Sequence, residues 1–140
     1  MTNAEMQIPY FGYEIIRGHV LKNILGKEAQ QLLYWMGKQV AREYPLETID
    51  GVYDFFQKAG WGYLTLEKQK KDELQFRLEG PFVEARLQHS EETEFRLETG
   101  FMARQFEYQN KRITEAFEEI KRRKNYVLIT VKWDDQDVTD

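Results

Sequence analysis

The sequence predicts an α+β domain, in which helical segments precede and follow an antiparallel hairpin. Apolar residues recur every three or four positions between residues 13 and 59, which is the period of α-helices. The period changes to two over residues 63–79, where two alternating runs flank a polar turn. This pattern is typical of a hairpin that buries one apolar face. The segment 126–131, rich in β-branched residues, favours a further strand near the end of the chain.

The first predicted helix covers residues 13–25 and follows a frayed lead-in over residues 1–8 and Pro9. Its apolar side chains fall on one helical face: Ile16, Val20, Leu21, Ile24 and Leu25. Gly26 ends this helix, because glycine readily accepts the left-handed conformation found after a helix C-terminus.

Residues 28–44 carry the clearest helical pattern in the chain. The apolar stripe consists of Ala29, Leu32, Leu33, Met36, Gly37, Val40, Ala41 and Tyr44. Gly37 has no side chain, so another helix or a sheet can approach the stripe closely at this position. Pro45 ends the helix, and Thr48 is the expected N-cap of a third helix over residues 49–59.

The hairpin follows Gly60. Its inward-facing residues are Leu64, Leu66, Leu74, Phe76 and Leu78. A polar turn over residues 68–72 joins the two runs, and Pro81 ends the second one. Residues 82–87 (FVEARL) are a candidate third strand, and residues 88–94 are interpreted as a loop.

A later helix is predicted over residues 95–108, with Phe95, Met102 and Phe106 on one stripe. Residues 113–120 are ambiguous, because strong helix formers are present although apolar and polar positions also alternate. If this segment is a strand, the basic residues 121–124 lie at a hairpin tip. Residues 134–140 are expected to form an acidic, loose tail.

Three local motifs carry a family resemblance: AGWGYLTL before the hairpin, FRLETGFMARQFE in the later helix and YVLITVKWDD near the end. Together with the order of elements, they make the whole chain similar to the YslB-type family of small proteins from Gram-positive bacteria. More distantly the chain resembles the 4-vinyl reductase domain, whose fold is related to TRAPP vesicle-tethering subunits and to haem nitric-oxide sensors. The resemblance implies a twisted antiparallel sheet of four or five strands, with three N-terminal helices and one later helix packed on it. It also favours strands over a helix for residues 113–120.

Relatives of this fold often pair through helices and enclose an apolar pocket. Their functional residues do not carry over to this chain. The 4-vinyl reductase domains that bind metal and the TRAPP subunits that carry an acyl chain use cysteine, which is absent here. Haem sensors need a proximal histidine and a Tyr-x-Ser-x-Arg motif, and the chain lacks that motif. The residues that do match the relatives support the fold and not its chemistry: Gly60, Trp61, Gly62, Gly100 and Phe101.

Composition excludes several classes of function. The 140 residues correspond to one domain, residues 1–140, and the lack of cysteine excludes disulfides, thiolate metal sites and cysteine nucleophiles. The net charge of −4 argues against a nucleic-acid partner and against binding to an anionic membrane. The sequence shows neither a signal-peptide pattern nor an apolar run long enough for membrane insertion. We therefore expect a soluble, cytoplasmic protein.

Side-chain spacing does not indicate a catalytic or metal site. His19 and His89 lie in unrelated segments without metal-ligand spacing, and the single serine, Ser90, lies in a charged loop. The glutamates of this region are interpreted as solvated charges: Glu91, Glu92, Glu94 and Glu98. The prediction is a non-enzymatic protein without a resident cofactor or metal ion.

Three groups of residues are candidates for binding. The ligand-pocket group is Trp61, Gly62, Gly100, Phe101 and Met102. The alternative is structural: Trp61 fills the core where a helix meets the sheet, and Gly100 packs against the sheet or Gly37. The dimer-surface group is Trp35, Leu21 and Leu25. The anion-contact group is Lys121, Arg122, Arg123 and Lys124.

These groups lead to a functional hypothesis with two alternatives. The chain is expected to bind an apolar small molecule or a protein partner, and to form a homodimer. One alternative is an accessory protein with a pocket-bound cofactor. The other is an assembly factor that contacts an acidic partner through its basic hairpin tips.

Overall fold

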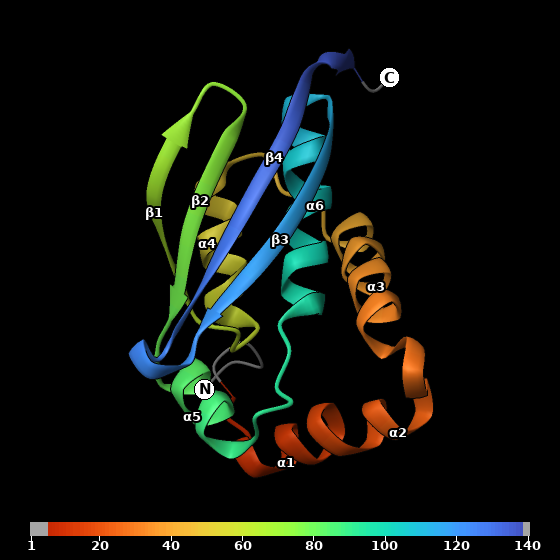
Figure 1. The fold of residues 1–140 in the computed structure, drawn as a ribbon, viewed down its shortest axis with the longest axis vertical. Helices are drawn as coiled ribbons and strands as arrows, with labels where there is room; N and C mark the ends of the chain where they lie inside the picture. The colour runs from red at the N-terminus through yellow and green to blue at the C-terminus, as the bar shows by residue number, and fades with distance from the viewer. Residues whose placement is uncertain (1–5, 139–140) are drawn as a thin grey trace.

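The fold is built around an antiparallel sheet in which the strands follow the order β1-β2-β4-β3 (Figure 1). The computed structural model describes residues 6–138, and within them the sheet has four strands. Their bounds are Tyr63–Lys70 for β1, Glu73–Glu79 for β2, Arg112–Lys121 for β3 and Tyr126–Val138 for β4. Helices α4 and α6 lie behind the sheet in this view, and α3 lies beside α6. The predicted α+β class is confirmed.

A long N-terminal helix runs through α1 (Tyr10–Glu14), the π-helical turn η2 (Ile15–Val20) and α2 (Leu21–Leu25). The 3-10 turn η3 (Gly26–Glu28) leads into α3 (Ala29–Glu43), and α4 (Ile49–Lys58) precedes the sheet. Helices α5 (Pro81–His89) and α6 (Arg96–Asn110) lie between β2 and β3. Thr48 caps α4 as predicted, because its Oγ1 accepts a hydrogen bond from the Gly51 N–H at 3.1 Å.

The segment 82–87 is a helix and not the candidate third strand. Gly80 turns the chain at a φ of 127°, and Pro81 occupies the first turn of α5, where proline is favoured. Val83, Arg86 and Leu87 are its buried residues, at helical spacing. Two helices therefore lie between the hairpins, where the sequence predicted one.

Residues 113–120 form a strand, as the family resemblance implied. β3 pairs with β4 from Thr114 opposite Trp133 to Lys121 opposite Tyr126, and the 3-10 turn η4 (Arg122–Lys124) forms the expected basic hairpin tip. β4 continues to Val138, opposite Arg112, so the expected loose tail is strand over residues 134–138. Residues 139–140 of that tail and residues 1–5 of the predicted lead-in lie outside the described residues.

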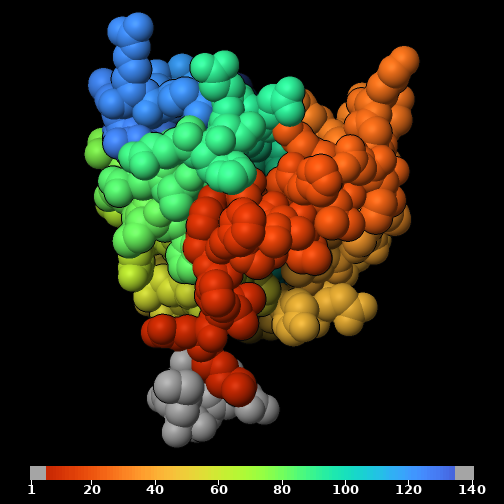
Figure 2. All heavy atoms as spheres, turned by 90° about the horizontal axis from the view of Figure 1, so that it is seen from below, coloured from red at the N-terminus to blue at the C-terminus, as the bar shows by residue number. Residues whose placement is uncertain are grey.

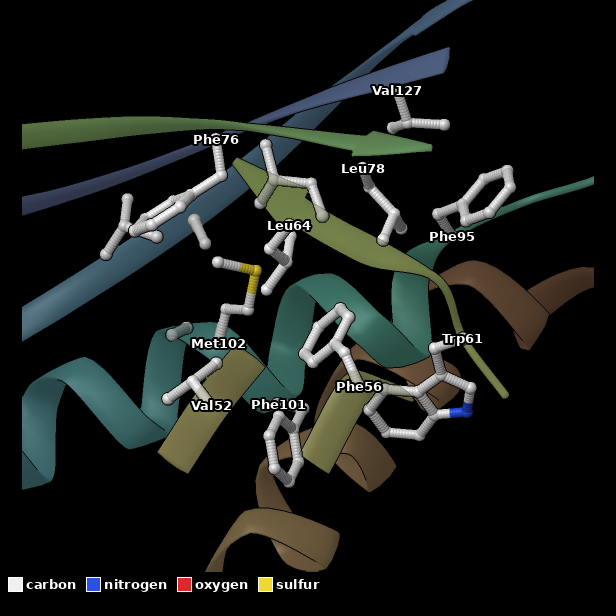
Figure 3. Packing of buried hydrophobic residues seen from close by; sticks show 14 of the residues in the cluster. Val52, Phe56, Trp61, Leu64, Phe76, Leu78, Phe95, Phe101, Met102 and Val127 are labelled. Carbon is white, nitrogen blue, oxygen red and sulfur yellow. The ribbon is translucent and has the colours of Figure 1, made fainter. Parts of the chain in front are cut away.

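The core fills the space between the inner sheet face and helices α4 and α6 (Figure 3). Alternate residues of β2 and β4 point inward, which matches the period of two in the sequence. The buried apolar residues of these strands are Leu74, Phe76, Leu78, Val127, Ile129 and Val131. They face Val52 and Phe56 of α4 and Phe101 and Met102 of α6.

Candidate interaction surface

The N-terminal helix has two charged residues turned inward and its isoleucines turned outward. Arg17 keeps only 4% of its surface exposed, and Glu14 is also buried. Ile24, by contrast, is 71% exposed. Of the apolar face that the sequence predicted here, Ile16 and Ile24 lie on the outside of the molecule, whereas Val20, Leu21 and Leu25 are half-buried. This arrangement is the reverse of an ordinary surface helix.

The π-helical turn and Gly18 shape the inner side of this helix. Residues of a π-helical turn are displaced from regular α-helical positions, and such turns are frequent at functional sites. The Glu14 carboxylate folds back over Gly18, because a Cβ at Gly18 would lie only 2.0 Å from Glu14 Oε1. Only glycine at position 18 therefore allows Glu14 to keep this buried position.

Arg17 is held by two carboxylates from α6 and the loop before it. Its Nη2 lies 2.9 Å from Glu94 Oε1 and 2.7 Å from Glu98 Oε1. Arg86 of α5 joins the same group, with its Nη1 3.0 Å from Glu98 Oε2. These four side chains form the buried ion cluster. It connects the N-terminal helix, α5 and α6.

The charges of the cluster stabilise one another. Burial by itself would raise the pKa of Glu98, but the guanidinium groups of Arg17 and Arg86 outweigh it and hold that pKa below its usual range. Burial likewise disfavours the charged form of Arg17, yet Glu98 and Glu94 raise its pKa well above the usual value. Glu98 and Arg17 are therefore both charged at neutral pH.

Two tyrosines extend the cluster along the helix. The Arg17 guanidinium donates to Tyr13 Oη at 2.8 Å, and Tyr10 Oη donates to Glu14 Oε2 at 2.7 Å. Burial raises the pKa of Tyr13, so this phenol stays neutral. These contacts fix the rotation of the helix about its axis, and with it the outward direction of the apolar residues.

The exposed apolar residues of the N-terminal helix and α3 form the apolar helix face. Figure 2 shows the N-terminal helix across the lower face of the molecule, with α3 beside it. The face consists of Phe11, Ile15, Ile16, Ile24, Leu32, Trp35 and Met36. Exposed apolar residues gathered on neighbouring helices are typical of contact sites on soluble proteins.

Comparison with known proteins identifies the family to which this architecture belongs. Residues 10–132 match the family model described as "Protein of unknown function (DUF2507)". The chain is 44% identical over 133 residues to "Uncharacterized protein YslB" of Bacillus subtilis (strain 168), covering 95% of this chain and 90% of that protein. The chain belongs to the DUF2507 family.

Solved structures share the DUF2507 fold at low sequence identity. A vinyl-4-reductase family protein from Methanocaldococcus jannaschii has a TM-score of 0.70 at 17% identity, with 95% of this chain and 89% of that chain covered. The phenol-responsive sensory domain of the transcription activator PoxR, solved with phenol, has a TM-score of 0.63 at 11% identity, with 91% and 76% covered. An Fe(II) unliganded H-NOX protein mutant from K. algicida has a TM-score of 0.58 at 13% identity, with 93% and 76% covered. These similarities establish a shared fold.

The ligand-pocket candidates lie inside the core of this DUF2507 chain. Phe101 and Met102 are fully buried, and Trp61 is almost so. Phe101 stacks on Phe55 with ring centroids 4.5 Å apart, and Trp61 meets Phe101 edge-on at 5.2 Å. Figure 3 shows Trp61 and Phe101 packed around Phe56.

The two glycines of that group have backbone roles. Gly62 has a φ of 136°, and a Cβ there would lie 2.9 Å from Glu79 O. A Cβ on Gly100 would lie 2.0 Å from Tyr34 O of α3. Both positions bring two backbone segments together, and the neighbour of Gly100 is the α3 backbone at Tyr34.

The dimer-surface and anion-contact candidates are only partly exposed. Trp35 is 55% exposed, whereas Leu21 and Leu25 are half-buried. Lys121 pairs with Glu119 at 2.9 Å, and the Arg122 guanidinium donates to the carbonyls of Leu87, Ser90 and Glu91 around the end of α5. Arg123 and Lys124 are the exposed members of the basic tip.

The two histidines share one cavity, although the sequence placed them in unrelated segments. His19 and His89 line a hollow of about 280 Å³ together with Phe11 and Glu14, and His89 Nε2 lies 3.8 Å from Glu14 Oε1. Within the described residues, no group of three or more His, Cys, Asp or Glu could hold a metal ion. Over the same part of the chain, no helix is long and apolar enough to cross a membrane.

Sequence reasoning missed the buried ion cluster. Glu94 and Glu98 were expected to be solvated, yet Glu98 is fully buried and Glu94 is nearly so. The signal was present in the spacing: Glu98 falls three residues after Phe95 and four before Met102, on the apolar stripe of α6. A glutamate on such a stripe requires cationic partners in the fold.

Proposed function

We propose that this DUF2507 chain is a non-enzymatic, cytoplasmic interaction domain that pairs with a second copy through the apolar helix face. The observation that carries the proposal is the reversed N-terminal helix. Its charged residues occupy the interior, where burial of a charge is costly, while its isoleucines face outward. A partner that covers these isoleucines supplies the missing apolar contact.

A second copy of the chain suits this surface. Most soluble oligomers are symmetric homodimers in which one patch meets its own copy. Aromatic residues and methionine are enriched in the centres of interfaces, and the apolar helix face contains Phe11, Trp35 and Met36. Because the buried ion cluster fixes the rotation of the N-terminal helix, the face is also preorganised for binding.

We do not extend the proposal to a bound apolar small molecule or a pocket-bound cofactor. The rings of Phe55, Phe56, Trp61 and Phe101 pack against one another between α4, α6 and the sheet, which argues against a ligand at this position. The small chamber beside the ion cluster has a volume of about 20 Å³, which suits one water molecule.

Sedimentation equilibrium of the whole chain tests this proposal. The chain is expected to sediment as a dimer, and Ile24→Glu or Trp35→Glu to sediment as a monomer, because a buried unpaired carboxylate in an apolar interface is strongly unfavourable. Leu66→Glu on β1 is the matched control: Leu66 is also an exposed apolar residue, but it lies outside the face, so this variant should remain dimeric. A monomeric wild-type chain, or variants that stay dimeric, would contradict the proposal.

A further inference from the structure

The outer face of the sheet carries a groove on the surface opposite α4 and α6. It has a volume of about 540 Å³ and lies where β3 begins and β4 extends towards its end. The β1–β2 turn reaches the same end of the sheet, because the Trp133 N–H donates to the Asp72 carbonyl at 3.0 Å. We call this hollow the sheet groove; it is distinct from the apolar helix face.

The floor of the sheet groove is apolar and aromatic. Ile113 and Phe117, on the outward side of β3, are 51% and 53% exposed. Trp133 of β4 also borders the groove, but it lies opposite the buried Thr114 in the register of the sheet, and its side chain packs against the core. These two exposed apolar side chains, one of them a phenyl ring, give a surface on which an aliphatic or planar group can lie.

The walls of the sheet groove are acidic. Carboxylates from three different segments line it: Asp72 of the β1–β2 turn, Glu115 of β3 and Asp134 of β4. The one basic residue of the lining is Lys132, which lies opposite Glu115 on β3 and opposite Glu73 on β2 in the register of the sheet. The lining therefore keeps an excess of negative charge.

The edge of β3 is blocked where it borders this groove. The N–H of Thr114 donates to Glu107 Oε1 at 3.1 Å, and the N–H of Ala116 donates to Tyr34 Oη at 3.1 Å. A partner segment therefore cannot add to the sheet as a further strand at these positions. It must bind the face of the sheet through its side chains.

The chain already holds three of its own arginines between a ring and a carboxylate. On the same sheet face, the Arg77 guanidinium lies 4.2 Å from the centre of the Tyr126 ring and pairs with Glu67. Elsewhere, Arg86 lies over Phe95 and pairs with Glu98, and Arg96 lies over Tyr34 and pairs with Glu118. The sheet groove offers the same combination in Phe117 and Glu115, and no arginine within residues 6–138 lies over Phe117.

We propose that the sheet groove binds an arginine side chain presented by a basic segment of a partner protein. The aliphatic stem packs along Ile113, the planar guanidinium stacks on Phe117, and its N–H groups donate to Glu115 and the neighbouring carboxylates. Arginine suits this site better than lysine, because only the guanidinium is planar and can stack and pair at once.

Titration of the ¹⁵N-labelled full-length chain with an acetyl-Gly-Arg-Leu-Arg-Gly-amide peptide, followed by NMR, tests the proposal. Shifts should concentrate on Asp72, Ile113, Glu115 and Phe117. The matched Lys peptide should bind at least roughly threefold more weakly, since it loses the stacking contact. Phe117→Ala should weaken binding of the Arg peptide roughly threefold to tenfold, and Glu115→Gln roughly twofold to fivefold, as expected for an exposed ring and an exposed charge.

Two matched controls separate this site from general charge and from the dimer surface. Leu66→Ala and Glu84→Gln remove an exposed apolar residue and an exposed carboxylate elsewhere, and should leave the dissociation constant unchanged. Trp35→Glu should also bind the peptide normally, so loss of the dimer and loss of this site are distinguishable. Circular dichroism confirms that each variant is folded.

Three outcomes would overturn the proposal. Equal affinity for the Arg and Lys peptides would reduce the site to general charge attraction. Unchanged binding by Phe117→Ala, or shifts centred on other residues, would place the site elsewhere. If Phe117→Ala lowered the sedimenting mass of the chain, the groove would be occupied by a second copy and not by a separate protein.

Discussion

Gly37 of α3 and Gly100 of α6 form a reciprocal contact in which each glycine lies against the backbone of the other helix. A Cβ on Gly37 would lie 2.1 Å from Leu97 O, and a Cβ on Gly100 would lie 2.0 Å from Tyr34 O. The two helix backbones therefore approach more closely than any side chain would allow. This contact fixes α3, which carries Trp35 and Met36 on its outer side, to the central helix of the core.

Gly100→Ala is expected to destabilise the chain by at least about 2 kcal/mol, because its methyl group would overlap a backbone carbonyl that cannot move without shifting α3. Gly12→Ala is the matched control. Gly12 is an exposed helical glycine with no atom within 4 Å of an added Cβ, so alanine there should stabilise the chain by about 0.5–1 kcal/mol. Urea unfolding measures both changes. Equal effects of the two substitutions would contradict the reciprocal contact.

Arg17→Met should destabilise the chain by about 3–5 kcal/mol, because it leaves Glu98 buried without one of its two guanidinium partners. The N-terminal helix should also lose protection in hydrogen exchange before the rest of the chain unfolds. Lys22→Met removes an ion pair from the same helix, but Glu92 is exposed and the pair is screened by solvent, so the effect should be much smaller. Similar losses for the two variants would show that the cluster does not hold the helix.

The acid sensitivity of the chain should depend on Glu98. Its pKa is lowered in the folded state, so the unfolded chain binds a proton more readily, and the stabilisation by this group is present above the unfolded pKa of about 4.3. It is lost as the pH falls from about 5 through the folded pKa. Unfolding free energies measured from pH 7 to pH 3 should therefore fall less steeply for Glu98→Gln than for the wild type.

Glu92→Gln serves as the control for this pH dependence. The pKa of Glu92 is also lowered, through its hydrogen bond to Lys22, but the group is fully exposed. Solvent and salt screen such a pair. At physiological ionic strength, the unfolding free energy of this variant should therefore fall between pH 7 and pH 3 as steeply as that of the wild type. If the unfolding free energy of Glu98→Gln fell with pH as steeply as that of the wild type, the cluster would not be the origin of the acid sensitivity.

The periodicity of the sequence predicted most helices and the first hairpin because their apolar spacing is regular. It failed at residues 82–87, where FVEARL suits a strand by composition but follows a glycine and a proline that begin a helix. Residues 113–120 were ambiguous from local pattern alone, and the family resemblance decided them correctly. In that segment the pairing with β4 outweighs helix propensity.

The candidate surface was harder to predict because periodicity shows which residues share a face, but not which face turns inward. On the N-terminal helix, the inward side is decided by Arg17, whose partners Glu94 and Glu98 are 77 and 81 residues away in the chain. Trp35 was identified from its position beside an apolar stripe. Leu21 and Leu25, the other two dimer-surface candidates, are half-buried in the orientation set by Arg17.

Phe101→Ala distinguishes a filled core from a ligand pocket at the aromatic cluster. Phe101 is fully buried and contacts the rings of Phe55, Phe56 and Trp61, so its truncation should cost about 3–5 kcal/mol and leave a cavity. Phe82→Ala, at a half-exposed ring outside this cluster, should cost much less.

Native mass spectrometry of the wild type should give the mass of the polypeptide alone, in whole-number multiples for any oligomer. A retained small molecule, together with a stable Phe101→Ala variant, would show that these rings line a binding pocket, because side chains that merely border a cavity lose few packing contacts when shortened.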